Sequence, residues 1–399
     1  MRTEMETSDP LEALVADVRA GHVGEVRRAI AEDPMLVHAY DPSEWCCRGT
    51  LLNLATSNGD REMIDALLDL GADINRKSDW WAGGFAPIHS VRTAHRPDLT
   101  EFLIERGATV DIHAAADHGF IDRLTELLDE RPDRVNQPGG DGASPLHFAA
   151  TREVAELLLE RGALLEPLDV DHGSTPAQWA ARERPDVTRY LLAQGAEGDP
   201  FMFVAIDDAT TVGALLELDF AAAKAVLSPS VFPSPGSKAG HIYSYQLGPY
   251  SSTLLHIAAA LDRREIVTLL VDAGAGLNTR GGYDDSAALH VAAWHGHADG
   301  VEHLVGLGAA IDQVSGSIHE NTPLGWALVN GKADVVERLL TLGAKVLPHH
   351  RTDLMSAAEG QFDFTAGTEE DFDRIAELLD GVEDVDPAGE GGLTSRPQP

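Results

Sequence analysis

One histidine of this sequence lies among carboxylates in a pattern that suits proton transfer. His172 directly follows Asp171 and lies three residues after Asp169. A neighbouring carboxylate raises the basicity of an imidazole, which allows general acid or base chemistry near neutral pH. We consider His172 as the acid or base, Asp171 as the group that orients it, and Tyr243 or Tyr245 as a hydrogen-bond donor to a developing oxyanion. The alternative interpretation of His172 is a solvated turn residue.

Aromatic residues in turn-rich segments form a second group of candidates. Tryptophan and tyrosine provide large contact areas at a small cost in side-chain entropy, and they are enriched in recognition surfaces. They predict a surface that binds a ligand or a partner. The alternative is that they pack over adjacent helices as small local cores. The candidate binding residues are Trp45, Trp80, Trp81, His172, Tyr243, Tyr245, Tyr283 and His319.

Familiar catalytic and metal-binding motifs are missing from the sequence. It contains no glycine-rich phosphate loop, no Gly-x-Ser-x-Gly nucleophile motif, no His-Glu-x-x-His zinc motif and no helix-loop-helix calcium loop. The two cysteines, Cys46 and Cys47, are adjacent and cannot supply a four-thiolate zinc site. We therefore expect no metal and no cofactor. An enzymatic activity would have to be cofactor-free proton transfer, as in a lyase, a cyclase or an isomerase.

The charge of the chain restricts its partners. Lys and Arg number 30 against 65 Asp and Glu, so the formal net charge is −35. Such a field repels nucleic-acid phosphates and anionic lipid. No apolar run approaches the roughly 20 residues that cross a bilayer, and the amino terminus lacks a basic and apolar signal pattern. We expect a soluble cytoplasmic protein with no nucleic-acid or membrane partner, whose protein partner presents Lys or Arg.

The elements that carry these residues follow an internal repeat. Three segments open with similar heptapeptides at spacings of 34 and 35 residues: Thr-Leu-Leu-His-Ile-Ala-Ala from Thr253, Ala-Ala-Leu-His-Val-Ala-Ala from Ala287, and Thr-Pro-Leu-Gly-Trp-Ala-Leu from Thr322. Each opening is followed by a turn residue, an apolar pair at helical spacing, and Gly-Ala. Further copies open at Thr50, Ala86, Ser144 and Thr175. Together with weaker copies they predict about eleven helix-turn-helix units over residues 10–380.

Ser-Pro-Leu-His-Phe-Ala-Ala at 144–150 and Thr-Pro-Leu at 322–324, at a period near 33 residues, resemble the ankyrin repeat. Within that family the chain resembles bacterial multi-repeat proteins. The resemblance implies an all-α solenoid whose units contact only their neighbours and whose loop tips line a concave groove. It also implies that the histidine in the fourth place of the opening bridges neighbouring turns. These histidines are His89, His147, His256 and His290.

The repeats divide the chain into four segments: an amino-terminal repeat block at 8–218, an insertion loop at 219–251, a carboxy-terminal repeat block at 252–380, and an acidic tail at 381–399. The insertion has a half rich in Pro and Ser and an aromatic half. Loops of this length are usually functional or disordered, and we interpret the insertion as a lid or wall of the groove. The tail is expected to be disordered.

Two functions fit these observations. The first is a soluble binding scaffold that recognises a protein partner through its concave groove and loop tips. The second is a small-molecule-binding protein, or a cofactor-independent acid-base enzyme, with its site in the groove under the 219–251 insertion. The repeat architecture favours the first, although a fold by itself identifies neither a partner nor a reaction.

Overall fold

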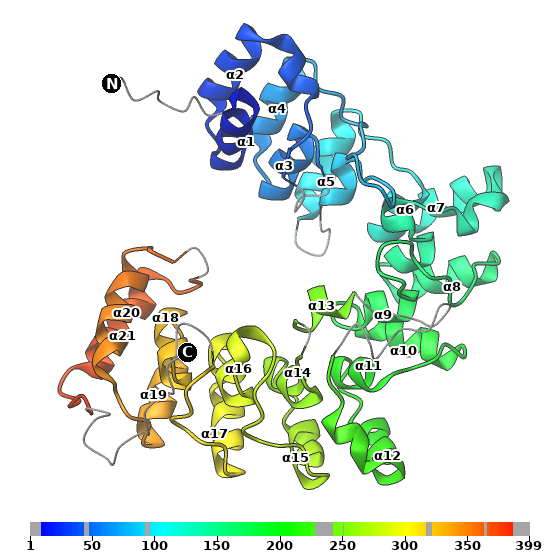
Figure 1. The fold of residues 1–399 in the computed structure, drawn as a ribbon. Helices are drawn as coiled ribbons and strands as arrows, with labels where there is room; N and C mark the ends of the chain where they lie inside the picture. Colours follow the sequence, from blue (N-terminus) through cyan, green and yellow to red (C-terminus); the bar gives the residue numbers. More distant parts are fainter. Residues whose placement is uncertain are drawn as a thin grey trace, which may run out of the picture. The chain divides into compact units, whose positions relative to one another are not determined.

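The computed structural model describes residues 9–43, 48–91, 96–227, 242–249, 251–316, 321–362 and 365–385. In these residues the regular secondary structure is helical, and extended segments meet only in isolated bridges. Successive helices form pairs joined by short turns (Figure 1). This arrangement confirms the predicted all-α solenoid of helix-turn-helix units.

The chain contains two compact units, and the first consists of Met1–Glu197 with Ser234–Ile242. The first helices of its pairs contact one another in succession and form an inner row. This row is α1 (Pro10–Ala20), α3 (Leu51–Asn58), η3 (Pro87–Ser90), α6 (Ile112–Asp117), η6 (Pro145–Phe148) and α9 (Pro176–Ala180). The second helices are α2 (Val23–Glu32), α4 (Arg61–Asp69), α5 (Pro97–Glu105), α7 (Ile121–Glu130), α8 (Arg152–Glu160) and α10 (Pro185–Ala193). Short helices η1 (Pro34–His38), η4 (Pro132–Asn136) and η5 (Gly140–Gly142) lie in the connections.

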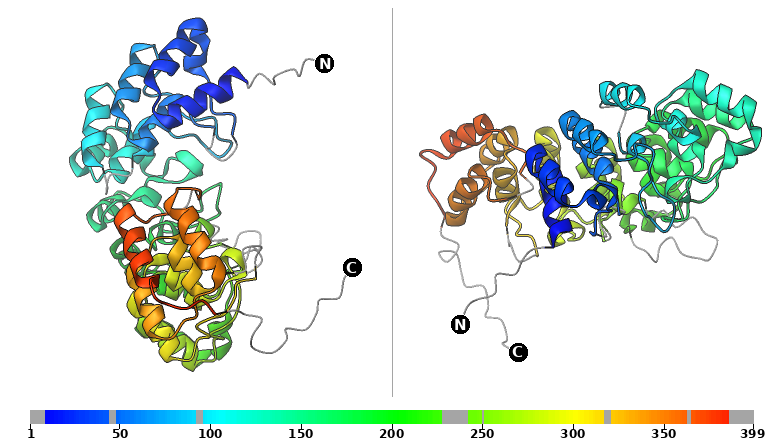
Figure 2. Two further views of the ribbon diagram at one scale, coloured as in Figure 1. Left: turned by 90° about the vertical axis from the view of Figure 1, so that its left-hand side faces the viewer. Right: turned by 90° about the horizontal axis from the view of Figure 1, so that it is seen from above.

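The second unit consists of Gly198–Pro233 with Tyr243–Pro399 and repeats the two-row arrangement, which Figure 2 shows from two further sides. Its inner row is α11 (Pro200–Ala205), α14 (Leu254–Ala260), α16 (Ala288–His295), α18 (Pro323–Val329) and α20 (Pro348–Ala358). Its outer row is α12 (Ala209–Leu218), α15 (Arg264–Asp272), α17 (Ala298–Gly306), α19 (Ala333–Thr341) and α21 (Glu369–Leu379). The connections hold η7 (Phe220–Lys224), α13 (Tyr243–Gln246) and η8 (Tyr283–Asp285).

Two segments of the expected insertion, 219–251, meet next to the start of α14. The N–H of Leu227 donates to the carbonyl of Ser252 at 2.8 Å, and the N–H of Ser251 donates to the carbonyl of Leu227 at 2.7 Å. Residues 228–241 and 250 lie outside the described part, as do residues 386–399 of the predicted tail. Leu227 and Ser251 are therefore neighbours beside the start of α14.

Buried histidines connect several units of the repeat to the next. The N–H of Thr253 donates to His256 Nδ1 at 3.1 Å, and His256 Nε2 lies 2.9 Å from the carbonyl oxygen of Ser286. His290 bonds Ala287 and the carbonyl of Asn321 in the same way. Because Nδ1 accepts a hydrogen bond from the backbone, the neutral ring carries its proton on Nε2 and donates it to the following loop. This geometry confirms the structural role expected for these histidines.

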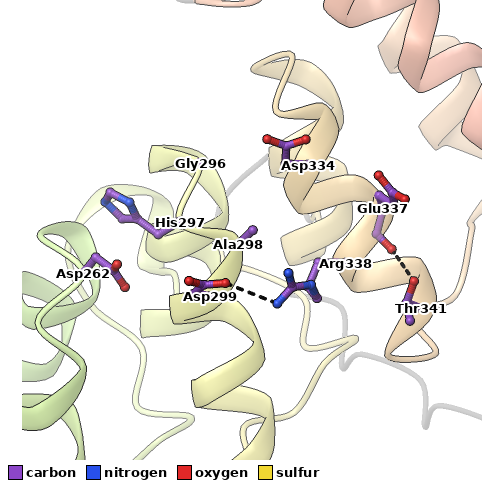
Figure 3. A pocket seen from close by; sticks show the side chains of 9 residues that line it. All are labelled: Asp262, Gly296, His297, Ala298, Asp299, Asp334, Glu337, Arg338 and Thr341. Atoms are coloured by element: carbon purple, nitrogen blue, oxygen red, sulfur yellow. Dashed lines mark hydrogen bonds and ion pairs between the residues drawn. The ribbon is translucent and has the colours of Figure 1, made fainter.

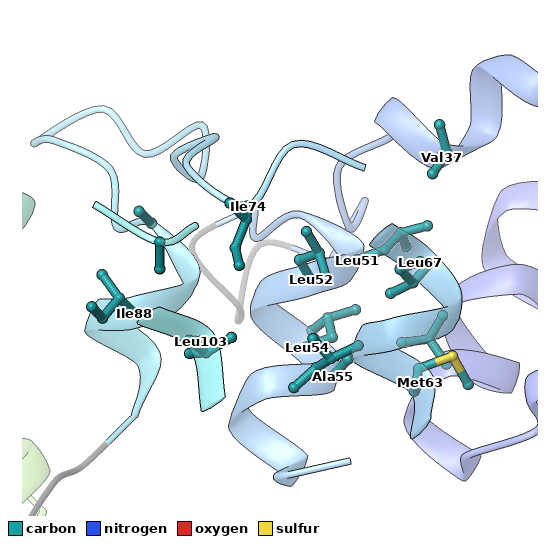
Figure 4. Close-up of a cluster of buried hydrophobic side chains, with 14 of the residues drawn as sticks. Val37, Leu51, Leu52, Leu54, Ala55, Met63, Leu67, Ile74, Ile88 and Leu103 are labelled. Atoms are coloured by element: carbon teal, nitrogen blue, oxygen red, sulfur yellow. The ribbon is translucent and has the colours of Figure 1, made fainter. Parts of the chain in front are cut away.

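Apolar side chains fill the space between the rows of helices. In the first unit one cluster includes Leu51, Met63, Leu67, Ile88 and Leu103, all of them fully buried (Figure 4). These residues come from successive helix pairs, so a single pair could not bury them alone. The core is therefore shared between neighbouring units of the repeat.

We expect Leu103→Ala to destabilise the first unit by about 2–5 kcal/mol, because the substitution opens a cavity in this cluster. Leu218→Ala is the matched control, since the Leu218 side chain is 86% exposed and should change the free energy of unfolding by less than about 0.5 kcal/mol. Urea denaturation of both variants provides the measurement. Equal effects at the two positions would contradict the assignment of the core.

We expect the stability of the repeats to fall on acidification. Burial, with a further contribution from Arg280, lowers the pKa of His290 from its ordinary 6.5 to about 4. Between pH 6.5 and about pH 4, the unfolded chain therefore binds a proton at His290 that the folded chain does not bind. The stabilisation is complete above pH 6.5 and is lost as the pH falls toward 4.

His290→Gln should weaken this pH dependence, which denaturant midpoints measured from neutral pH down to about pH 4.5 would show. The chain itself uses glutamine in this place, because Gln178 Oε1 accepts the N–H of Thr175 at 3.0 Å. Glutamine does not titrate, so the variant lacks the proton uptake of His290. A variant whose midpoints shift with pH as much as those of the wild type would contradict this role.

Candidate functional site

Three loops of the first unit, 78–85, 137–144 and 166–174, are joined through their backbones, and we call them the loop stack. The N–H of Asp141 in the middle loop donates to the carbonyl of Gly83 at 3.1 Å. The carbonyl of Asp141 in turn accepts the N–H groups of Val170 at 2.8 Å and Asp171 at 3.2 Å. The middle loop therefore holds the other two in a fixed order.

This stacking brings the backbones very close together. Gly83 has a φ of +122°, and a Cβ atom there would lie 2.3 Å from the carbonyl oxygen of Gly139. Asp141 has a φ of +55°, in the left-handed region that aspartate tolerates better than most residues. The loop stack thus depends on residue types suited to these two backbone positions.

Asp169 is the buried hydrogen-bonding centre of the third loop. Its Oδ1 accepts the N–H groups of His172 at 3.0 Å and Ser174 at 2.9 Å. Its Oδ2 lies 2.8 Å from His172 Nδ1 and accepts the indole N–H of Trp179 at 2.8 Å. Burial opposes ionisation of this carboxyl, but these hydrogen bonds outweigh it and lower the pKa of Asp169.

His172 lies between carboxylates on both sides of its ring. Nδ1 contacts Asp169, and Nε2 lies 3.8 Å from Asp171 Oδ2. Burial would lower the pKa of His172, but the hydrogen bond from Asp169 and the surrounding negative charges raise it above its ordinary value. Trp80 completes this side of the site, because its indole N–H donates to Asp171 Oδ2 at 3.2 Å.

Asp141 is the carboxylate of the site that has no partner. Its side chain is 8% exposed, and within the described residues no hydrogen bond or ion pair reaches its carboxylate. Burial raises the pKa of Asp141 to about 7; the charge of His172 opposes the shift, and Asp171 and Asp169 add to it. One carboxylate oxygen each of Asp141 and Asp171 and one ring nitrogen of His172 lie within 4.8 Å of one another. These three residues are the ones in the described chain that could hold a metal ion together.

The structure brings together some of the residues predicted from the sequence. Trp80, Asp171 and His172 share the loop stack, but the carboxylate on His172 Nδ1 is Asp169, whereas Asp171 was expected to orient the ring. Tyr243 belongs to the second unit, where it is fully buried and its hydroxyl donates to Asp199 at 2.9 Å. Two of the candidate binding residues, Trp45 and His319, lie outside the described residues.

The sequence interpretation missed Asp141, although the repeat contained a signal for it. Asp141 lies three residues before the repeat opening at Ser144, and His172 lies three residues before the opening at Thr175. Equivalent positions of neighbouring repeats are adjacent in a solenoid. A comparison of loops at the same offset would therefore have paired Asp141 with His172.

Several apolar side chains of the loops are exposed. In the loop stack Trp81 is 69% exposed and Val170 is 57% exposed. In the second unit the exposed fractions are 76% for Tyr245 and 63% for Tyr283. Trp80, by contrast, is half-buried and its ring lies 6.2 Å from that of Trp81. One aromatic residue of this pair supports the loop stack and the other faces solvent.

The second unit carries an acidic depression of about 540 Å³ beside its outer helices (Figure 3). Its lining includes the acidic residues Asp262, Asp299, Asp334 and Glu337. The one arginine among the lining residues, Arg338, pairs with Asp299 at 3.5 Å and with Glu302. Arg264 pairs with Asp262 and Asp299, and Arg374 pairs with Asp334 and Glu337, so each of these acidic residues has an arginine partner.

Comparison with known proteins identifies the family. The family model "Ankyrin repeats (3 copies)" matches residues 112–201, 237–315 and 289–365, and the model "Ankyrin repeat" matches residues 47–76. These matches cover more than half of the sequence, so the chain belongs to the ankyrin-repeat family. Membership in this family makes the chain a protein-interaction scaffold.

The chain resembles parts of larger proteins. It is 35% identical over 99 residues to palmitoyltransferase ZDHHC13 of Mus musculus, a match that covers 24% of this chain and 16% of the relative. It is 36% identical over 91 residues to ankyrin repeat and SAM domain-containing protein 6 of Mus musculus, which covers 22% of this chain and 10% of the relative. The matches thus span less than a fifth of either relative.

A solved structure, the human ASB11 ankyrin repeat domain, aligns with 67% of this chain and 96% of its own at 21% identity and a TM-score of 0.34. Among the described helices, none has the length and apolar character needed to cross a membrane.

We expect Gly83→Ala to disrupt the loop stack, because the new methyl group would collide with the carbonyl of Gly139. Gly107→Ala is the matched control. Gly107 also has a positive φ, +97°, but no atom lies within 4 Å of the position that its new methyl group would take, so the control reports backbone strain alone. Gly83→Ala should lower the unfolding midpoint of the first unit clearly more than Gly107→Ala does. Equal losses would show that the loops do not pack as described.

Proposed function

We propose that this chain binds a protein partner with a basic segment, and that the loop stack of the first unit supplies the central contacts. The carrying observation is the exposure of Trp81 and Val170 on loops that are fixed in place by backbone hydrogen bonds. Exposed aromatic residues on a rigid support bind with little loss of conformational entropy.

The charge of the chain supports a basic partner. The formal net charge is −35, and Asp79 and Asp171 lie in the loop stack beside the exposed apolar side chains. Attraction between an acidic surface and Lys or Arg of a partner speeds association and disfavours acidic competitors.

The small-molecule and acid-base alternative stays a hypothesis from the sequence. Its acid-base form required a histidine base oriented by Asp171 and a tyrosine donor at Tyr243 or Tyr245. Here the ring nitrogens of His172 face Asp169 and Asp171, and the hydroxyl of Tyr243 is bonded to Asp199. This arrangement suits binding of positive charge better than proton transfer to a substrate.

We expect the double variant Trp81→Ser, Val170→Ser to lose affinity for its partner by about 30-fold, which corresponds to the roughly 2 kcal/mol of a strong interface residue. Proteins retained by the immobilised wild-type chain are identified, and their affinities are measured with the purified components. Met355→Ser is the matched control, because Met355 is 64% exposed but belongs to the second unit.

The retained partner should carry a basic segment, and binding should weaken as salt is added. Wild-type affinity in the double variant would contradict the loop stack as the binding surface. Binding that is insensitive to salt would contradict the basic partner.

A further inference from the structure

We propose that Asp141, Asp171 and His172 form a binding site for one divalent transition-metal cation, Zn²⁺ or Mn²⁺, between the second and third loops of the loop stack. The sequence predicted no metal, since the three residues do not have the spacing of a known motif. They belong to two repeats and come together only because the loops stack. This inference is independent of the proposed partner.

The geometry is close to that of a metal site. The three possible ligand atoms lie within 4.8 Å of one another. In a tetrahedral site with metal-ligand distances of about 2.0–2.2 Å, two ligand atoms are separated by about 3.3–3.6 Å. Side-chain rotations that move these atoms by about an ångström therefore bring all three onto one cation. The remaining coordination positions would be filled by water.

The surroundings of Asp141 indicate that this residue binds a ligand. It is 8% exposed, it lies in reach of the other two ligand atoms, and its carboxylate has no bonding partner among the described residues. A largely buried carboxylate that has no partner of its own gains from a cation close by. Aspartate suits the left-handed backbone of position 141, but no hydrogen bond or ion pair of the described residues uses its carboxylate, which leaves it available to a cation.

The site also contains more negatively than positively charged side chains. Three carboxylates, those of Asp141, Asp169 and Asp171, surround a single imidazole. Within the described part of the chain, no Lys or Arg forms an ion pair with any of them. The other side-chain donors are the neutral indoles of Trp80 and Trp179. A divalent cation would balance this excess of negative charge.

Asp169 provides the support that a histidine ligand needs. Its carboxylate holds His172 Nδ1 at 2.8 Å and is itself fixed by two backbone N–H groups. A carboxylate on one ring nitrogen commonly orients the other nitrogen toward a metal and increases its basicity. The expected donor set is two carboxylate oxygens and one imidazole nitrogen. This mixture favours Zn²⁺ or Mn²⁺ over Mg²⁺ and Ca²⁺, which prefer oxygen alone.

The test is calorimetric titration of the full chain, stripped with EDTA and dialysed, with ZnCl₂, MnCl₂, MgCl₂ and CaCl₂. We expect one equivalent of Zn²⁺ or Mn²⁺ to bind more tightly than Mg²⁺ or Ca²⁺. Asp141→Asn should weaken that site by about tenfold or more. Asparagine accepts the left-handed backbone of position 141, so the loop is expected to keep its shape.

Asp284→Asn is the matched control. Asp284 also lies three residues before a repeat opening and has a φ of +53°, but its side chain is exposed. This variant should bind the cation as the wild type does, which distinguishes the site from adventitious binding by surface histidines.

A second variant keeps the test independent of any folding defect at position 141. Asp171→Asn retains an oxygen for the indole N–H of Trp80 and should weaken binding to a similar degree. Thermal unfolding in EDTA checks each fold, and Asp141→Asn should be at least as stable as the wild type there. A wild-type chain that takes up neither Zn²⁺ nor Mn²⁺ would overturn the proposal. So would wild-type affinity in both Asp141→Asn and Asp171→Asn, or an equal loss in Asp284→Asn.

Discussion

The structure depends on the hydrogen bond that a buried side chain makes from one repeat to the backbone of the next. His256 and His290 make it with Nε2, and Asn53 makes it with its amide nitrogen to the carbonyl of Phe85. Where the opening has Gly325, His350 of the following repeat donates its Nε2–H to the hydroxyl of Thr322. Different side chains thus serve one purpose. Each fixes the distance and register between neighbouring units, without which the shared apolar core could not close.

The register between units also determines which residues of different loops become neighbours. Because each loop lies at a fixed offset from its repeat opening, equivalent residues of successive loops are neighbours. Gly83, Asp141 and the start of the third loop are joined in this way. Side chains that are 31 residues apart in the sequence, such as those of Asp141 and His172, therefore meet. The chemistry of the loop stack follows from the periodicity of the repeat and not from any local motif.

Periodicity was sufficient to predict the helix pairs and the bridging histidines. It was not sufficient for contacts that depend on side-chain directions. Asp171 is adjacent to His172 in the sequence, but the turn directs Asp169 toward the ring nitrogen Nδ1. Trp80 and Trp81 are adjacent residues of the same type, yet only Trp80 donates its indole N–H to the carboxylate of Asp171. Tyr243 lies in a loop segment of the sequence, but it is buried and bonded to Asp199. Each of these outcomes is set by a local chain reversal that residue type alone does not determine.

The second and third loops of the loop stack pack closely against each other beside Asp141. A Cβ atom at Gly142 would lie 2.2 Å from the side chain of Val170, so the third loop rests directly on the second. Asp141 is 8% exposed, whereas Asp284, at the same offset in the second unit, is exposed. Both residues have a positive φ that aspartate tolerates, so the backbone accounts for an aspartate at either position. The backbone does not account for the burial of Asp141 beside Asp171 and His172, and this is the arrangement that a bound cation would stabilise.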